Sequence, residues 1–271
     1  RDSSTSRGLG DVYKRQITGN ILGAALPMLV AQILNLLYNI VDRIYIARIP
    51  EIGTAALGAV GLCFPIIVII TAFSNLFGTG GAPLFSIFRG KKDPDTARRI
   101  MNTSFTMLCI CAMILMAVGF LFARPILILF GASAEAIVYA YPYMMLYLIG
   151  TLPSMIAVGM NPFINAQGYS SIGMLSVAIG AGTNLVLDPL FIFALGLGVR
   201  GAAIATVLAQ VISLVWQLRI LSNKQELLHF RRGIYRLRKK IVRDMLAIGM
   251  SPFLMNLAAC FIVILINKGL K

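Results

Sequence analysis

The chain of 271 residues is far more apolar than a water-soluble protein of that length. Hydrophobic residues make up 58 % of it, charged residues make up 13 %, and the formal net charge is +14 at pH 7. A soluble domain is about 25 % charged, so this chain has too few polar side chains to cover a surface that faces water. The composition excludes a disordered protein, a coiled coil and a secreted disulfide scaffold, and it indicates an integral membrane protein.

Seven segments are long and apolar enough to cross a bilayer as helices, which need about 20 mostly apolar residues each. The turn signal at 167–171 divides the long uncharged run 136–187 into two of them. The predicted spans are 17–46, 55–77, 100–123, 139–166, 172–197, 201–221 and 245–267. We therefore expect an all-α integral membrane protein, with a six-helix transmembrane lobe at 17–221 and a seventh helix, within 245–271, that begins a second lobe.

The basic residues predict which ends of the spans face the cytoplasm. Nine Lys and Arg lie from Arg219, near the end of the sixth span, to Arg243, before the seventh, and five lie between the second and third spans, whereas the other gaps are poor in them. Cytoplasmic loops are enriched in Lys and Arg, so we expect a multi-pass plasma membrane protein whose amino terminus is cytoplasmic. Anionic lipid headgroups account for the basic surplus, and no nucleic-acid partner is expected.

Two stretches lie outside the predicted spans. Residues 1–16 are polar and lack the apolar core of a signal peptide, so we expect a disordered leader or an expression-vector remnant. Residues 222–244 alternate basic residues with apolar ones at steps of three or four, which predicts a basic amphipathic linker on the cytoplasmic surface. Pro27 and Pro252 lie near the starts of the first and seventh spans, as expected of two repeated six-helix halves.

Polar side chains inside the spans are the candidates for function, because a charge within a bilayer is costly and is rarely kept without a role. Two carboxylates qualify, Asp42 and Asp188. Residues three or four positions apart share one face of a helix. Three such stripes are present: Gln32, Asn35, Asn39 and Asp42; Asn184 and Asp188; and Thr206, Gln210, Ser213 and Gln217.

Three of these residues are expected at similar depth in the outer half of the membrane. At 1.5 Å per residue, Asp42 lies about 6 Å, Thr206 about 8 Å and Asp188 about 14 Å from the outer end of its span. With the amide of Asn184 they form an all-oxygen site for a hard cation, and the two carboxylates can equally share one proton. A bound cation or a proton would relieve their repulsion.

Structural roles compete with these functional ones. Asn and Gln in spans often only join helices, which applies to Gln32, Asn35, Gln210 and Gln217. Asp42 can also pair with Arg43 or Arg48 near the membrane edge, whereas Asp188 has no cation near it in sequence. Pro27 and Pro189 are candidate hinges, and their alternative role is helix packing.

Enzyme chemistry is not indicated. His229 is the only histidine, which removes zinc hydrolases and histidine-based triads. The glycine-rich run 78–81 lacks the Lys-Ser/Thr and the preceding strand of a phosphate loop. We expect neither an enzyme nor a cofactor, apart from a coupling ion.

Three stretches are similar to the multidrug and toxic compound extrusion (MATE) family of secondary transporters. The most specific is Asn-x-x-x-Asp-Pro followed by Gly-Val-x-Gly-Ala-Ala-x-Ala-Thr. The stretches are LPMLVAQILNLLYNIVDRIYIARI (26–49), NPFINAQG (161–168) and NLVLDPLFIFALGLGVRGAAIATVLAQ (184–210).

The resemblance implies a two-lobed transporter of twelve helices that exports small cationic amphipathic drugs in exchange for Na⁺ or H⁺. It implies a cation site at Asp42, Asn184, Asp188 and Thr206. A substrate cavity or polar network is expected at Gln32, Asn35, Asn39, Asn161 and Gln210. Family members are about twice as long as this chain, so we expect the carboxyl-terminal lobe that transport requires to be missing.

Two other functions remain open at this point. A lipid-linked oligosaccharide flippase of related architecture would need basic residues in its cavity, whereas these spans carry acids and essentially no internal Lys or Arg. A non-transporting membrane module would tolerate neutral replacement of both aspartates. The acids favour cationic cargo.

Overall fold

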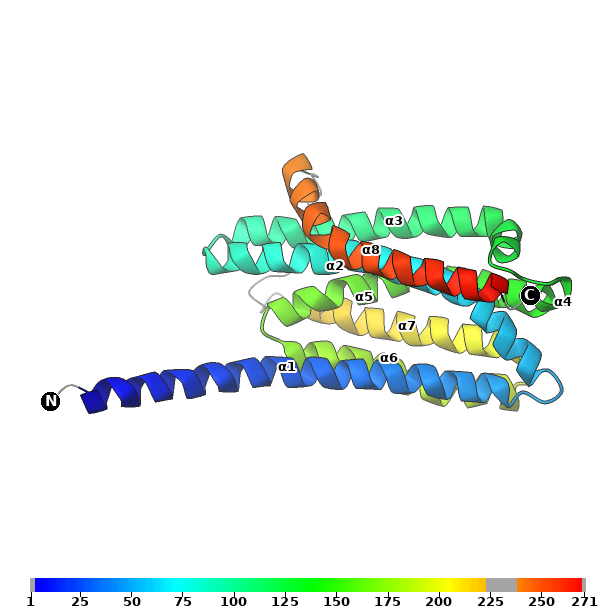
Figure 1. The fold of residues 1–271 in the computed structure, drawn as a ribbon, viewed down its shortest axis with the longest axis horizontal. Coiled ribbons are helices and arrows are strands. Elements are labelled where there is room, and N and C mark those ends of the chain that lie inside the picture. The colour runs from blue at the N-terminus through cyan, green and yellow to red at the C-terminus, as the bar shows by residue number, and fades with distance from the viewer. Residues whose placement is uncertain (1–2, 223–237, 270–271) are drawn as a thin grey trace.

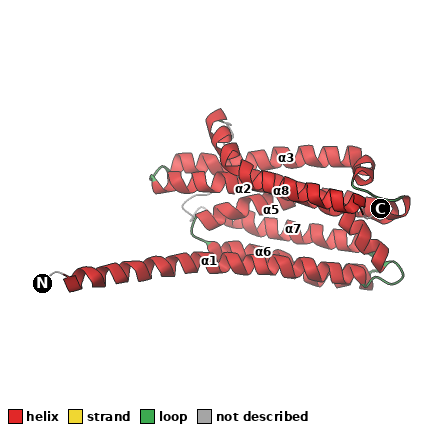
Figure 2. Cartoon of the chain, in the orientation of Figure 1, coloured by secondary structure: helices red, strands yellow, loops and turns green. Residues whose placement is uncertain are grey.

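The computed structural model describes residues 3–222 and 238–269, and every element in that part of the chain is helical (Figures 1 and 2). The expectation of an all-α membrane protein is confirmed. The elements are α1 (Ser3–Ala47), α2 (Gly53–Gly90), α3 (Pro94–Leu129), α4 (Ala134–Ile149), α5 (Thr151–Ala166), α6 (Ser170–Pro189), the π-helical turn η1 (Leu190–Ala194), α7 (Val199–Leu221) and α8 (Lys239–Gly269).

Six helices in the described residues are long and apolar enough to cross a membrane, and α4 with α5 makes a seventh when the bent pair counts as one span. The seven predicted spans are therefore present, with the fourth one broken. Most of the amphipathic linker predicted for 222–244 lies outside the described residues. From Lys239 onward, its last residues already belong to α8.

The first helix begins at Ser3, inside the stretch 1–16 for which the sequence predicted a disordered leader or an expression-vector remnant. The backbone of this stretch is helical from Ser3 onward, and the origin of the leader stays a prediction. A polar segment that directly precedes a span can extend its hydrogen-bond ladder, because adding residues to a helix avoids the cost of nucleating one. Composition alone therefore did not mark the start of α1.

The fourth span, predicted over 139–166, is bent by 56° between α4 and α5. Two residues explain the break. Pro153 has no N–H to donate to the carbonyl of Ile149, so the helical ladder is interrupted there. A Cβ on Gly150 would lie 2.8 Å from Val207 Cγ2 and 2.9 Å from Gln210 Oε1. The bend thus sits where α7 approaches too closely for a side chain.

The helices pack in two groups joined by α4, α5 and α7. Helix α2 lies against α3, α4, α5 and α8, while α1 lies along α6, and α6 lies along α7. Figure 1 shows α2, α3 and α8 on one side of the molecule and α1 with α6 on the other. Arg89 Nη1 donates to the carbonyl of Ala166 at 2.9 Å and so joins the end of α2 to the end of α5.

Short connections are fixed by capping side chains. Asp93 precedes α3 and accepts a hydrogen bond from the backbone N–H of Thr96 at 3.0 Å, and Ser133 caps α4 in the same way through Ala136 at 3.2 Å. Hydrogen bonds from Thr96 lower the pKa of the Asp93 carboxyl. The cap therefore stays charged at neutral pH and accepts from the orphan N–H groups that begin the helix.

Helix α8 crosses α2 at glycines. A Cβ on Gly80 would lie 2.5 Å from the carbonyl oxygen of Met245, and a Cβ on Gly249 would overlap the carbonyl oxygen of Leu76. Beside the crossing, Ser104 Oγ donates to the carbonyl of Phe77 at 3.0 Å and lies 3.3 Å from Met245 Sδ. The two backbones approach this closely because neither glycine places a side chain between them.

This crossing predicts a penalty for one methyl group. We expect Gly249→Ala to lower the melting temperature of the chain in detergent, because its Cβ would meet backbone that cannot move aside, at a cost of about 1–3 kcal/mol. The matched control is Gly58→Ala in α2, where a Cβ meets nothing within 4 Å. Equal melting temperatures for the two variants would contradict the close crossing.

Candidate cation and substrate site

Three helices bring the four predicted cation ligands together. Asp42 comes from α1, Asn184 and Asp188 from α6, and Thr206 from α7. Measured along each helix from the adjacent helix ends at Ala47, Ala194 and Val199, Asp42, Asp188 and Thr206 lie about 8, 9 and 10 Å in. They agree more closely than the sequence predicted, because the helical segment after Asp188 ends at Ala194 rather than at residue 197.

Asn184 is the centre of the hydrogen-bond network. Its Nδ2 donates to Asp188 Oδ1 at 3.2 Å and points to Thr206 Oγ1 at 3.4 Å. The hydroxyl of Thr206 in turn donates to the carbonyl of Ala202 at 3.0 Å. Asn184 is 3 % exposed and Asp188 is 1 % exposed, so these two side chains are buried.

The carboxyl groups of Asp42 and Asp188 lie close enough for each to affect the charge of the other. Asp42 Oδ1 and Asp188 Oδ2 are buried and have no hydrogen-bond partner. In the described ranges the ion pair formed is Arg98–Asp95 at 3.7 Å, so Asp42 pairs with neither Arg43 nor Arg48. Two facing carboxylates repel one another, and a cation or a shared proton removes that repulsion.

A change of helix type follows Asp188 at once. Pro189 lacks the N–H that would bond the carbonyl of Leu185, and the turn after it is π-helical, with Leu195 N donating to Leu190 O at 2.9 Å. Gly201 makes room for this wider turn, because a Cβ there would lie 2.7 Å from the backbone of Phe191. π-Helical turns often mark functional sites, and here one begins directly after a candidate ligand.

Pro27, the other predicted hinge, does not interrupt its helix as Pro189 does. Helix α1 runs through Pro27 as one continuous helix. Its role as a hinge stays a prediction, as does that of Pro189.

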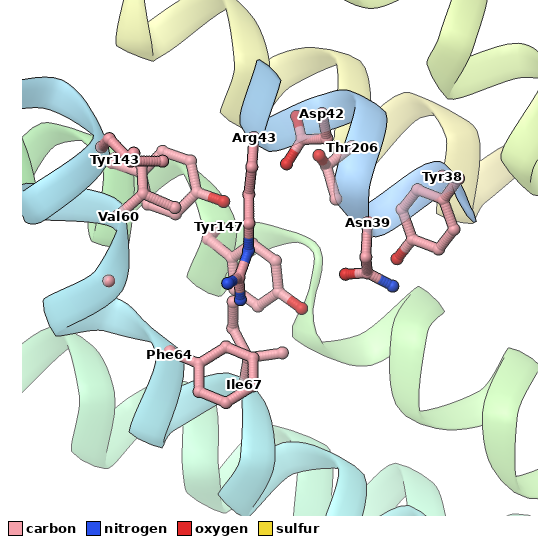
Figure 3. Close-up of a pocket in the computed structure, with 12 residues that line it drawn as sticks. Tyr38, Asn39, Asp42, Arg43, Val60, Phe64, Ile67, Tyr143, Tyr147 and Thr206 are labelled. Carbon is pink, nitrogen blue, oxygen red and sulfur yellow. The ribbon is translucent and has the colours of Figure 1, made fainter. Parts of the chain in front are cut away.

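A cavity of about 220 Å³ opens beside the cation cluster (Figure 3). Asp42 and Thr206 belong both to its lining and to the cluster. Aromatic rings supply much of the remaining wall: Tyr38 from α1, Phe64 from α2, and Tyr143 and Tyr147 from α4. The cavity thus combines a carboxylate with aromatic faces.

Sequence reasoning missed these aromatic residues, although spacing held part of the signal. Tyr38 precedes Asp42 by four residues, and Tyr143 precedes Tyr147 by four, so each pair shares a helix face. The rings of Tyr143 and Tyr147 stack with centroids 6.1 Å apart. The predicted polar stripes contain only amide, carboxylate, and Ser or Thr hydroxyl side chains, so they omit these tyrosines.

Arg43 corrects a second expectation. Arg43 falls near the end of the first predicted span, and the sequence indicated essentially no Lys or Arg inside the spans. In the structure Arg43 lies within α1 and lines the cavity, with its Cζ 5.2 Å from the centroid of the Phe64 ring. The cavity therefore contains one cationic side chain, held on an aromatic face.

The remaining polar residues of the α1 stripe lie on the amino-terminal side of Asp42. Asn39 lines the cavity, and its Nδ2 donates to the carbonyl of Asn35 at 2.7 Å. Gln32 and Asn35 are exposed at the surface of the chain. The predicted stripe is thus one open face of α1 that leads into the cavity.

Of the two remaining polar candidates, Gln210 stays near the cavity and Asn161 does not. Gln210 lies one helical turn after Thr206 on α7, beside Gly150 at the bend between α4 and α5, and its side chain reaches Tyr147, which lines the cavity. Asn161 Nδ2 donates to the carbonyl of Gly173 at 3.0 Å and joins α5 to the start of α6. Gly173 is about 22 Å along α6 from Asp188, so the structure does not bring Asn161 into the site.

Curated relatives carry export functions in their names. The multidrug export protein MepA of Staphylococcus haemolyticus is 28 % identical over 231 residues, which cover 85 % of this chain and 51 % of that protein. MepA of Staphylococcus aureus is 23 % identical over 243 residues, which cover 90 % of this chain and 53 % of that protein. The chain spans about half the length of the curated relatives it matches.

Solved structures of MATE transporters share the fold. An outward-facing conformation of a multidrug resistance MATE family transporter is 27 % identical, with a TM-score of 0.81, and the match covers 88 % of this chain and 52 % of that one. An inward-facing conformation is 25 % identical, with a TM-score of 0.81, covering 90 % and 56 %.

The family model described as MatE matches residues 27–190, which include Asp42, Asn184 and Asp188. That is more than half of the chain, and the fold agrees with the solved members. The chain therefore belongs to the MATE family of membrane transporters.

Proposed function

We propose that this chain forms the cation-binding lobe of a multidrug exporter, in which Na⁺ or H⁺ drives export of small cationic amphipathic compounds by alternating access. The observation that carries the proposal is the facing pair of Asp42 and Asp188, each with an open buried oxygen, beside an aromatic cavity. The proposal concerns the whole transporter, of which this chain corresponds to one half.

The chemistry of the cluster favours a monovalent cation. Its donors are carboxylate, amide and hydroxyl oxygens, which suit hard ions. Within residues 3–222 and 238–269 there is no group of three or more His, Cys, Asp and Glu side chains that could hold a metal ion. Two carboxylates with neutral oxygens match Na⁺, and the same two carboxylates match one proton shared between them.

The cavity favours an organic cation. Phe64, Tyr143 and Tyr147 offer aromatic faces, which attract positive charge, and Asp42 offers a carboxylate at the same wall. An amphipathic cation would place its apolar body on the rings and its charge near Asp42. Arg43 does not convert the cavity into an anion site, because its guanidinium is already engaged with Phe64.

Asp42 belongs both to the cavity wall and to the carboxyl pair, and this shared position would couple ion binding to substrate binding. The same carboxyl group lines the cavity and faces Asp188. It can therefore bind the substrate or the coupling ion strongly, but not both at once. A cation that arrives from outside would draw Asp42 toward Asp188, bend α1 and shrink the cavity. Substrate would then leave, and substrate arriving from the cytoplasm would reverse the change.

Alternating access is supported by the comparisons at the level of the lobe. The chain matches an outward-facing and an inward-facing transporter with the same TM-score of 0.81. A lobe that keeps its fold in both states fits a mechanism in which two halves rock as bodies about a central site. The basic connection between α2 and α3 faces the cytoplasm in this proposal, as does the amino terminus, in the plasma membrane.

The first test measures the coupling ion. We expect Na⁺ to bind saturably to the chain in detergent, followed by calorimetry over a pH series, and Asp188→Asn to abolish the binding because one of the two carboxylates is lost. Asp95→Asn is the matched control, since Asp95 is exposed in the first turn of α3 and its replacement also deletes one negative charge.

Other results of that experiment have distinct meanings. Proton uptake that Asp188→Asn removes, without Na⁺ binding at any pH, would identify the pair as a proton site. Full binding in an Asp42→Asn, Asp188→Asn double variant would contradict the proposal and favour a non-transporting membrane module. Competition by an anionic pyrophosphate rather than by an organic cation would favour the oligosaccharide flippase.

A second test separates Na⁺ from H⁺ at Thr206. Thr206→Val removes the hydroxyl at nearly constant volume, and we expect the affinity for Na⁺ to fall about tenfold, which is the factor that 1.4 kcal/mol produces. Thr206→Ser keeps the hydroxyl and should bind Na⁺ nearly as the parent chain does. Equal affinities in the valine and serine variants would exclude Thr206 as a ligand.

A further inference from the structure

Arg43 is the single Lys or Arg among the residues that line the cavity, and it adjoins Asp42 in sequence. Successive residues of a helix point about 100° apart, so the two side chains leave α1 in different directions. Figure 3 shows the Arg43 side chain extending from α1 toward Phe64, while Asp42 points elsewhere. A cation that could pair with the adjacent carboxylate lies on an aromatic ring instead.

The contact with Phe64 has the geometry of a bound cation. The guanidinium carbon lies 5.2 Å from the ring centroid, within the distance of about 6 Å at which a cation is attracted to an aromatic face. Because Arg43 belongs to α1 and Phe64 to α2, the contact bridges two walls of the cavity. Arg43 is also exposed, so its guanidinium can move into solvent without breaking an ion pair.

We propose that Arg43 is a built-in occupant of the cation subsite on Phe64, which its guanidinium fills until an organic cation displaces it. The inference rests on the proposed function and adds a competitor that belongs to the protein itself. An incoming cation gains the face of Phe64 only after Arg43 has left it. Arg43 therefore sets the affinity for cationic substrates and excludes those that bind too weakly to displace it.

The experiment uses tetraphenylphosphonium as the probe, with the full chain in detergent and calorimetry as the readout. Arg43→Met keeps an unbranched side chain and removes the cation. If the guanidinium fills the subsite about 90 % of the time, its removal makes the probe bind about tenfold tighter. Arg48→Met is the matched control, because Arg48 lies beyond α1 and does not line the cavity, and its affinity for the probe should equal that of the parent chain.

Loss of charge repulsion alone would also tighten binding, and two further variants separate the explanations. Arg43→Lys keeps the charge but loses the planar group that lies on the ring, so we expect an affinity between those of the parent and Arg43→Met. Phe64→Leu removes the subsite, so we expect weaker binding and a much smaller gain when Arg43→Met is added. Equal affinities for the lysine variant and the parent, with additive effects in the double variant, would overturn the inference.

The outcomes also separate this inference from the proposed function. Probe binding that Arg43→Met leaves unchanged or weakens overturns the inference and leaves the exporter proposal standing. No probe binding by the parent, Arg43→Met or Arg43→Lys chains overturns both. Arg43→Gln repeats the test with a shorter neutral side chain, so a folding defect in the methionine variant does not decide the result.

Discussion

Two carboxyl groups face each other inside an apolar bundle, and each keeps a buried oxygen without a protein partner. The surrounding helices position the two carboxyl groups. Helix α6 carries Asn184 and Asp188 on one face, and α7 supplies Thr206. The π-helical turn begins directly after Pro189. The protein supplies hydrogen bonds to one carboxyl group and leaves the charge of the pair unbalanced. In the function proposed above, a cation or a proton that enters and leaves would supply that balance and so couple its own movement to export.

The sequence predicted the number and order of the spans and the depth of the cluster, because apolar length and helical spacing are properties of single segments. It could not show which faces meet. Tyr143 and Tyr147 on α4 come into one cavity with Tyr38 on α1 through tertiary packing alone. Arg43 lies near the end of its predicted span, and the sequence could not show that its side chain reaches Phe64 on α2 rather than the neighbouring Asp42.

The other differences between prediction and structure also arise from contacts between helices. Asn161 has the composition of a site residue, but its partner is the backbone of Gly173, and no spacing rule reports a hydrogen bond to another helix. The bend at Gly150 needs both a missing donor at Pro153 and a close neighbour on α7. Only the first of these is visible in a sequence, and prolines elsewhere in the chain, such as Pro27, leave their helix continuous.

The glycine crossing of α8 over α2 has a mechanical consequence. Side chains that interlock between two helices act like gear teeth, and turning one helix against the other then requires many rotamers to change together. At Gly80 and Gly249 backbone rests on backbone. Such a contact resists separation, because the close approach maximises dispersion contacts. Side chains hold the rest of the interface: the rings of Phe73 and Phe253 pack edge to face with centroids 5.0 Å apart, and Cys260 Sγ donates to the carbonyl of Pro65 at 3.6 Å. The glycines therefore set how closely α8 approaches α2, and the side chains on either side of them resist rotation of one helix against the other.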